Sequence, residues 1–515
     1  MRITSRSALI SFWLISQAEG AEPIVGVVVD ANGAPVVGAR VKVQASGAET
    51  TTGADGRFVV SRTPADAPAK YVTAGKVGYL NGGCALRAER RTCSITLKKL
   101  PARDFVGYAW THPRRPSVPH DATKQPCRDC HPRQFIEWRR STHATSGVNR
   151  AFLDAFSGGP TFVKGLDFKT SFPASNGNCA TCHVPAQALK DPFGANPTRA
   201  RGVERAGVFC DVCHKTADTE TNADGSRPGV LSMRFVRPRP GEKHFFGPLA
   251  DVFPRPNAYS PASRESRFCA PCHNGGFWNN VAYSEFAEWS TSDYARRGIT
   301  CQSCHMKPHA ESGRFATRKS GGLVRPASEN RMHDFPGTSL LGTGAVLTVT
   351  AHVDGDRLRV TVRVHNRGAG HHIPTGSPAR NVVLTVAAKD AKGKPLKLVE
   401  GPIVPTWVGD ALAGMPGRGF AKIFAGAVSY EGKTRGRSAA IHPAPYWRPA
   451  NIVADTRIAA NATDVSTYAF ARAVRSDGPI VVTAQLRHFR FYAAWLKNRK
   501  MKPAAVMERA IVVSP

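Results

Sequence analysis

The sequence has few acidic residues and no long apolar stretch. Against 70 Lys and Arg, the 515-residue chain carries only 38 Asp and Glu, which gives a formal net charge of +32. No segment approaches the roughly 20 apolar residues that a membrane-spanning helix requires, so no transmembrane segment is expected. No module with interleaved aromatic and basic residues is visible, so nucleic acid is not an expected partner. Twelve cysteines are too few for a small disulfide scaffold, which makes their positions more informative than their number.

The N-terminal residues indicate the cellular compartment. Arg2 and Arg6 precede a short apolar run at 8–15, and small residues follow up to Gly20. This order is typical of a secretory signal peptide, predicted here at 1–20. The alternative, an uncleaved membrane anchor, needs an apolar run more than twice as long. We therefore expect a periplasmic or extracellular protein in an oxidising environment.

The length favours about three domains, at roughly 150 residues each. Residues 21–100 carry short β-branched runs separated by turn signals such as Asn32-Gly33 and Asp55-Gly56, which predicts a small β-sandwich. Cys84 and Cys93 lie in this segment. The compartment favours a disulfide between them, and two unpaired thiols are the alternative.

The same segment resembles the carboxypeptidase regulatory-like family. The resemblance rests on Gly26–Asp30, Gly33–Ala39, Asp55–Phe58 and Val77–Tyr79. It implies a prealbumin-like β-sandwich that serves as an accessory module.

Residues 337–515 return to a β pattern. Leu358, Val360, Val362 and Val364 alternate with polar residues, a period of two that buries one face of a strand. Similar runs elsewhere in this segment predict a C-terminal antiparallel β-sandwich.

Residues 101–336 differ from both, because they contain ten of the twelve cysteines and few regular patterns. Two amphipathic helices are predicted, one starting at Pro132 and one at 284–297. The segment has too little periodic apolar sequence to build its own core, so we expect a mostly α and irregular domain whose interior is filled by something else.

Five Cys-x-x-Cys-His motifs indicate what fills this interior. They are Cys127, Cys130 and His131; Cys179, Cys182 and His183; Cys210, Cys213 and His214; Cys269, Cys272 and His273; and Cys301, Cys304 and His305. This is the attachment motif of c-type haem: two cysteines on one turn form thioethers to the porphyrin, and the next histidine becomes the proximal iron ligand. Zinc sites do not require a histidine after every pair, and thioredoxin-like proteins carry one motif. The sequence predicts five covalently bound haem c groups.

The steps between motifs alternate between long and short, which favours pairing of the second with the third haem and of the fourth with the fifth. Local sequence indicates a duplicated unit. Phe135-Ile-Glu-Trp138 follows the first motif, and Phe286-Ala-Glu-Trp289 follows the fourth; Arg205–Phe209 and Arg296–Thr300 precede the third and the fifth. Aromatic side chains such as Trp138 and Trp289 are expected to pack on the haem faces.

Each iron needs a sixth ligand, and twelve histidines remain. His143, His333 and His371 are the best candidates, the first near the end of a predicted helix and the others in loops rich in glycine and proline. Further candidates near the motifs are His112, His120, His244 and His309.

At this point the sequence resembles the ammonia-oxidation tetrahaem cytochromes and their hydroxylamine-oxidoreductase-like multihaem relatives. The resemblance rests on the first motif with Trp138 and Ser141–His143, the fourth and fifth motifs with Glu288-Trp289, His333–Gly337 and Gly370–Gly376. It implies bis-histidine haems with His143, His333 and His371 as distal ligands.

Two departures from the family pattern stand out. Asn257–Ser260 replaces a histidine that relatives often carry before the fourth motif, so one haem is expected to have another sixth ligand or an open site. No Cys-x-x-Cys-Lys motif is present, so the lysine-ligated haem of nitrite-reducing relatives is not expected.

These observations favour a secreted pentahaem cytochrome that carries electrons between redox proteins. Ten haem propionates lower the net charge to about +22, a field that favours acidic partners or anionic substrates. An oxidoreductase acting on a small nitrogen or sulfur compound at an open-site haem is the first alternative, so whether the chain is an enzyme stays open. A surface scaffold of an extracellular redox complex is the second. The electron donor and acceptor, the haem potentials and the oligomeric state are not encoded in any motif.

Overall fold

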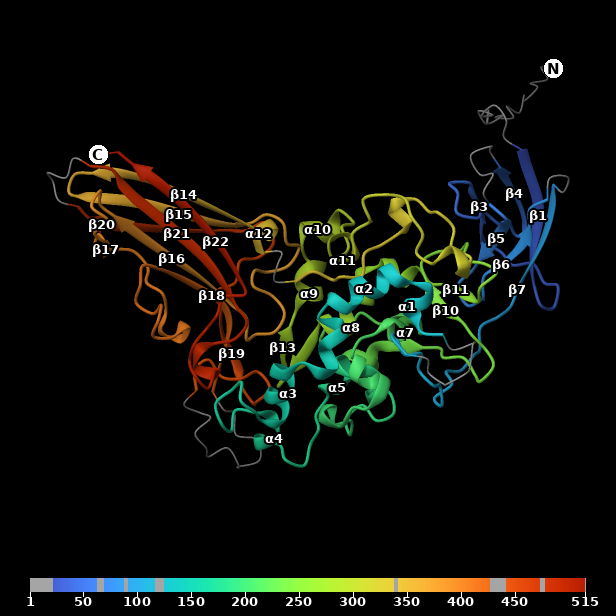
Figure 1. Ribbon diagram of the computed structural model, residues 1–515, viewed down its shortest axis with the longest axis horizontal. Helices are drawn as coiled ribbons and strands as arrows, with labels where there is room; N and C mark the ends of the chain where they lie inside the picture. The colour runs from blue at the N-terminus through green and yellow to red at the C-terminus, as the bar shows by residue number, and fades with distance from the viewer. Residues whose placement is uncertain are drawn as a thin grey trace, which may run out of the picture. The chain divides into compact units, whose positions relative to one another are not determined.

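The computed structural model describes residues 22–62, 69–87, 91–115, 125–337, 341–426, 441–472 and 478–514 (Figure 1). The predicted signal peptide at 1–20 and the candidate ligand His120 lie outside the described residues. The chain forms two compact units. The first comprises the described residues up to Pro101 together with Leu249–Tyr259, which fall inside the segment expected to bind haem; the second comprises Ala102–Pro248 and the residues from Ser260 onward.

The first unit consists of two sheets around one hydrophobic core. Their strand orders are β4-β1-β7 and β3-β2-β5-β6. Val28, Val41, Val72 and Ile95, contributed by both sheets, are completely buried. The strands are β1 (Glu22–Asp30), β2 (Arg40–Val43), β3 (Glu49–Thr51), β4 (Arg57–Arg62), β5 (Tyr71–Gly75), β6 (Gly82–Ala85) and β7 (Thr92–Leu97), with β11 (Asn257–Tyr259) in the later segment.

The turn predicted at Asn32-Gly33 forms, but the strands before and after it, β1 and β2, belong to different sheets. The Asp30 carboxylate accepts hydrogen bonds from the backbone N–H groups of Asn32 and Ala34 at 2.9 and 3.0 Å, and Gly33 has a φ of 82°, which glycine adopts without strain. Only a bridge to Pro35 follows, and β2 joins the other sheet. A disulfide links the two sheets, from Cys84 of β6 to Cys93 of β7.

The segment with the five motifs is built from short helices and short strand pairs, drawn in cyan to yellow in Figure 1. The helix predicted to start at Pro132 is confirmed as α2, whereas the helix predicted at 284–297 is divided into α9 and α10. The first ends at Ser290 with Thr291 as its C-cap, and Ser292 begins the second, because its side chain accepts a hydrogen bond from the backbone N–H of Ala295. The helices are α1 (Cys127–Cys130), α2 (Pro132–Arg140), α3 (Arg150–Ser157), α4 (Phe168–Ser171), α5 (Ala180–His183), α6 (Pro185–Ala188), α7 (Cys210–His214), α8 (Ala270–His273), α9 (Glu285–Ser290), α10 (Asp293–Arg296) and α11 (Cys301–His305); the strands are β8 (Thr216–Thr219), β9 (Met233–Phe235), β10 (Phe245–Gly247), β12 (Gly275–Phe277) and β13 (Asn280–Tyr283).

Two antiparallel sheets follow α12 (Leu341–Gly344) and are drawn in orange and red in Figure 1. Their orders are β14-β15-β20-β17 and β19-β18-β16-β21-β22. The predicted alternation is confirmed in β15, where Leu358, Val360, Val362 and Val364 are buried in a core shared by both sheets. The strands are β14 (Ala345–Asp354), β15 (Arg357–Asn366), β16 (Asn381–Lys389), β17 (Leu398–Glu400), β18 (Gly417–Ala425), β19 (Asn451–Asp455), β20 (Thr463–Ala471), β21 (Ile480–Phe489) and β22 (Ala505–Val513). In the described part of the chain, no helix combines the length and the apolar character needed to cross a bilayer.

Candidate functional site

Each of the five Cys-x-x-Cys-His motifs folds as one helical turn. The first forms α1 with His131 directly after it, and the other four histidines close α5, α7, α8 and α11. Because residues three apart on a helix lie on the same side, both thiols of a motif face the same way. All ten cysteines are unbonded and partly buried. This donor set fits two thioether bonds and one axial imidazole.

Backbone carbonyl groups orient three of the proximal histidines through their Nδ1 atoms. A carbonyl oxygen only accepts hydrogen bonds, so each Nδ1 carries the proton and each Nε2 keeps a lone pair for a metal. The pairs are His131 with Phe315 at 2.6 Å, His214 with Phe246 at 2.7 Å and His305 with Pro336 at 2.7 Å.

His273 and His183 are held differently. Nδ1 of His273 lies 3.4 Å from Oε1 of Glu285, the first residue of α9. Burial alone would raise the pKa of Glu285, but its contact with His273 lowers that pKa, so the carboxylate stays ionised. Nδ1 of His183 is buried with no hydrogen-bond partner among the described residues, and its ring stacks on Phe152 with centroids 3.8 Å apart.

Two further histidines face proximal histidines at the spacing that iron requires. The ring centroids of His305 and His371 are 6.3 Å apart with planes at 17°, and those of His273 and His143 are 6.2 Å apart with planes at 73°. Metal–imidazole bonds of about 2 Å on either side of one ion place the two centroids roughly 6 Å apart. Burial lowers the pKa of His143 to about 3, which keeps this ring neutral, as ligation requires.

His333 is also buried and lies near His214, the histidine that affects its pKa most. Burial is the main cause that lowers the pKa of His333 to about 4. Its Nδ1 is 2.9 Å from the carbonyl oxygen of Arg331, which leaves Nε2 free. The backbone N–H of His333 donates to Oε2 of Glu137 at 2.9 Å, so a carboxylate of α2 fixes the segment that carries this ring.

Two of the further candidates lie beside other polar groups. Nε2 of the buried His244 lies 2.6 Å from the carbonyl oxygen of Val236 and donates a hydrogen bond to it, and His244 stays a predicted candidate. Nε2 of His309 faces Oε1 of Glu137 at 3.4 Å.

His112 makes hydrogen bonds with its own loop. Its Nδ1 accepts hydrogen bonds from the backbone N–H groups of Arg114 and Arg115 at 2.9 and 3.1 Å. The ring of His131 interacts electrostatically with those of His214 and His333.

The thiols of different motifs meet one another. Cys127 of the first motif contacts Cys210 of the third, Cys269 of the fourth contacts Cys301 of the fifth, and Cys182 of the second contacts Cys272 of the fourth. Cys213 of the third motif adds an electrostatic interaction with both cysteines of the fourth. The fourth and fifth motifs meet as predicted, but the third meets the first instead of the second.

The duplicated sequence is also a duplicated structure. Trp138 donates its indole N–H to the carbonyl of Val208 at 2.9 Å, just before the third motif, and Trp289 donates to the carbonyl of Ile299 at 2.8 Å, just before the fifth. In each copy the glutamate before the tryptophan accepts a backbone N–H from a histidine of a distant loop: Glu137 from His333, and Glu288 from His372 at 3.0 Å. The repeated Phe-x-Glu-Trp pattern is the signal in the sequence from which these glutamate contacts could be predicted.

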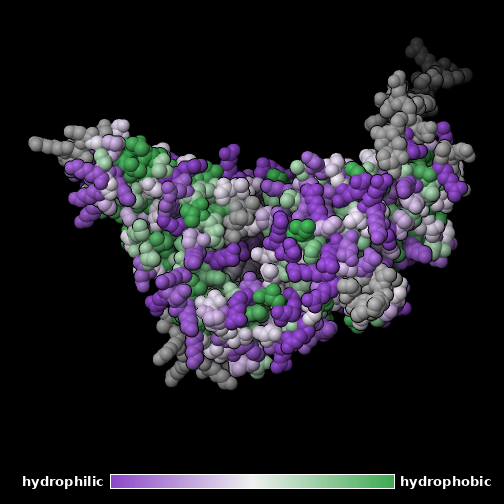
Figure 2. Space-filling view, viewed as in Figure 1, coloured by the Kyte–Doolittle hydropathy of each residue, from purple (hydrophilic) through white to green (hydrophobic). Residues whose placement is uncertain are grey.

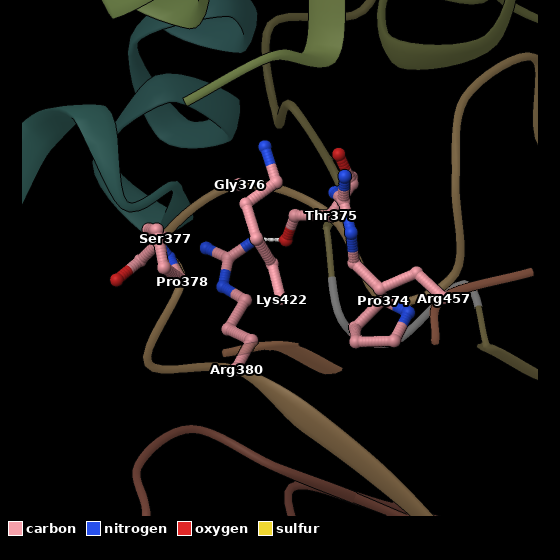
Figure 3. Close-up of a pocket in the computed structure, with 8 residues that line it drawn as sticks. All are labelled: Pro374, Thr375, Gly376, Ser377, Pro378, Arg380, Lys422 and Arg457. Atoms are coloured by element: carbon pink, nitrogen blue, oxygen red, sulfur yellow. Dashed lines mark hydrogen bonds between the residues drawn. The ribbon is translucent and has the colours of Figure 1, made fainter. Parts of the chain in front are cut away.

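Glu288 is the centre of a buried ionic group. Burial alone would raise its pKa, but the contact with His372 and the charge of Arg457 hold it well below the ordinary value. Oε1 of Glu288 lies 2.6 Å from Arg457 and 3.2 Å from Nδ1 of His372. The loop after His372 lines a narrow pocket whose cations are Arg380, Lys422 and Arg457 (Figure 3).

Two tyrosines that sequence reasoning did not single out lie beside the second motif. The hydroxyl groups of Tyr283 and Tyr446 are hydrogen-bonded to each other, and both interact electrostatically with Cys179. Burial raises the pKa of both tyrosines, so both are neutral donors. No local sequence pattern indicates this contact, because 162 intervening residues separate the two rings.

Comparison with known proteins agrees with this chemistry. Residues 126–215 match the family described as cytochrome c554 and c-prime. The crystal structure of a penta-heme cytochrome c552 from Thermochromatium tepidum is similar at a TM-score of 0.50, with 19% identity over 75% of this chain and 97% of that chain. The ASH / PapD-like domain of human CEP192 matches 33% of this chain and 84% of its own at 7% identity and a TM-score of 0.13, which is too weak to indicate a shared fold. The search of curated proteins gave no match.

The matched family covers the first three motifs and their helices, and the fold similarity extends over three quarters of the chain. Together with five one-turn Cys-x-x-Cys-His helices and imidazole pairs spaced for iron, these findings support a multihaem c-type cytochrome.

Proposed function

We propose that the chain carries five haem c groups and transfers electrons between redox proteins. The thioether cysteines are the ten of the five motifs, and the proximal ligands are their five histidines. The distal ligands are His371 for the haem of His305, His143 for that of His273 and His333 for that of His214. Haem iron, when bound, supplies one-electron chemistry.

The contact of the motifs with one another is the observation that carries this proposal. Thiol contacts and interactions join the first motif to the third, the third to the fourth, and the fourth to both the second and the fifth. A protein that stored or sensed haem separately would not need its attachment sites in contact. Five neighbouring sites in one unit favour transfer along the chain of cofactors.

The remaining predictions support an extracytoplasmic carrier. The predicted signal peptide and the Cys84–Cys93 disulfide fit a periplasmic or extracellular location. The excess of basic residues favours acidic redox proteins as partners. The N-terminal sheets and the C-terminal sheets serve as accessory modules of the haem-binding part, the first with the carboxypeptidase regulatory-like fold.

Haem counting and electron paramagnetic resonance test the proposal. We expect five haems per chain and low-spin signals from the haems of His214, His273 and His305. Replacement of the distal ligand in the His371→Ala variant removes one low-spin signal and adds a high-spin signal. The control is His365→Ala, a partly exposed histidine of β15, which leaves the spectrum unchanged. Fewer than five haems, or no spectral change in His371→Ala, contradicts the assignment.

A second candidate function is catalysis at the haem of His183. The ring of His183 stacks on Phe152, and the Tyr283–Tyr446 hydroxyl pair lies beside the cysteines of its motif. A neutral hydroxyl donor of this pair next to an open iron position suits the reduction or oxidation of a small nitrogen or sulfur compound. A high-spin haem in the unmodified protein, sensitive to added nitrite or sulfite, favours this function over transfer alone.

A further inference from the structure

The outward side of α2 is basic around an exposed isoleucine. Phe135 and Trp138 face inward, and Ile136 is 42% exposed on the opposite side. Three exposed arginines surround it: Arg133, Arg139 and Arg140. In Figure 2 the surface over α1 and α2 is mostly hydrophilic.

A second segment adds charge to the same place. The backbone N–H of Thr317 donates to the carbonyl of Cys130 at 2.8 Å, and the carbonyl of Phe315 orients His131, so residues 311–320 lie directly on the first motif. We call the combined surface the basic face. Its exposed cations are Arg128, Arg133, Arg139, Arg140, Arg314, Arg318 and Lys319, against the exposed acids Asp129 and Glu311.

The internal repeat shows that the fold does not need these cations. The equivalent helix α9 carries the same Phe-x-Glu-Trp pattern and the same tryptophan hydrogen bond, yet it contains no Lys or Arg. Packing therefore requires the buried side of both helices, and the arginines of α2 serve something outside the repeat.

The first motif is one of three terminal members of the branched network of contacts, with the second and the fifth. Cys127 touches Cys210 of the third motif, whereas the fourth motif meets the second, third and fifth. An electron that enters at one end of such a series can reach every other site, so a terminal site suits exchange with a partner.

We propose that the basic face is the docking site of an acidic electron-transfer protein that donates to the haem of the first motif. The proposal rests on the proposed function. In the step, the partner is oxidised by one electron and ferric iron at the first motif is reduced to ferrous iron, with no proton required. The separated cations attract the acidic partner over a Debye length, and Ile136 supplies an apolar contact in a small transient interface.

A fully reduced flavodoxin, a small acidic flavoprotein, is the probe, and stopped-flow absorbance follows haem reduction. The test variant replaces Arg139, Arg140, Arg318 and Lys319 by Gln, which removes four charges without touching the Arg133–Glu137 contact. The matched control replaces Lys389, Lys392, Lys394 and Arg509 by Gln, four exposed cations of the C-terminal sheets with the same total charge. At low ionic strength the second-order rate falls about tenfold in the test variant and less than twofold in the control, and high salt removes the difference.

Equal losses in both variants, or none in either, overturn the proposal, because the net charge alone or no charge effect would then explain the rate. Haem content and full reduction by dithionite test the proposed function separately, since a chain without reducible haem fails there first. A measurement on the unmodified protein avoids any folding defect. Hydrogen exchange with oxidised flavodoxin is expected to show protection at 127–140 and 311–320, and protection confined to other segments contradicts the proposal.

Discussion

The segment with the five motifs and the C-terminal sheets lie in one unit, but they fill their interiors in opposite ways. The sheets share a cluster of buried aliphatic residues that includes Leu358, Val382 and Leu486. The main cluster of the haem-binding segment, among the described residues, consists of alanines and aromatic rings, such as Ala180 and Trp138, with three valines and no buried leucine or isoleucine. Small side chains leave room for a group that the chain does not encode. The sheets thus supply their own folding energy, whereas the haem-binding segment depends on its cofactor.

Producing the chain without haem attachment gives the largest expected effect. Without porphyrin, the interior of 125–337 cannot bury enough apolar surface to offset the entropy of ordering, so this segment stays unfolded while the C-terminal sheets form. Limited proteolysis and hydrogen exchange check this. If 125–337 were as well protected from proteolysis and hydrogen exchange in the haem-free chain as in the holoprotein, the prediction would be wrong. The Cys84→Ser/Cys93→Ser variant, which loses the disulfide and its two cysteines but keeps all five motifs, is the control.

A substitution that creates a cavity between the sheets is expected to give the next largest loss of stability. Leu384 of β16 is completely buried, and Leu384→Ala removes its packing at a cost of about 2–5 kcal/mol of unfolding free energy. We expect the sheets to unfold at lower denaturant concentration by tryptophan fluorescence. Haem absorbance should change less, because Leu384 belongs to the cluster between the two sheets. Val512→Ala, at a side chain that is 68% exposed, should leave both transitions in place.

Lys422 of β18 joins the two regions, and its titration should change stability. Its Nζ donates to the carbonyls of Val281 and Ala282 and to Oγ of Ser284 at 2.8–3.3 Å. Burial lowers the pKa of this lysine to about 8, below the value of about 10.5 in the unfolded chain. The unfolded state therefore binds more protons between pH 8 and 10.5, and the unfolding free energy rises with pH in that window by up to about 3 kcal/mol.

Lys422→Met should flatten this rise, because the substitution removes the buried charge. Denaturant titrations at pH 8 and pH 10 measure the difference. Lys389→Met, at an exposed lysine of β16, serves as the control and should retain the slope. A rise of equal size in Lys422→Met would assign the pH dependence to other groups.

What the sequence predicts follows from how local each signal is. The alternation in β15 and the five motifs are local patterns, and both appear in the structure as predicted. The pairing of the third motif with the first, through Cys210 and Cys127, is a tertiary contact that the spacing of motifs does not determine. The same limit applies to Glu285, which meets His273 only because α8 and α9 pack together.

Glu285→Gln gives the smallest effect, a change of potential without a change of fold. The carboxylate next to Nδ1 of His273 makes that ligand more basic than the histidines that face carbonyl groups, and a more basic ligand stabilises ferric iron. Removing the negative charge should raise the midpoint potential of this haem by roughly 60 mV or less, at most a tenfold change in its one-electron equilibrium. A spectroelectrochemical titration resolves the shift, and Glu204→Gln, at a glutamate that pairs with Lys190 away from any proximal histidine, should leave every potential unchanged. An unshifted fourth haem would show that the polar surroundings of the haem-binding segment position its ligands but do not tune them.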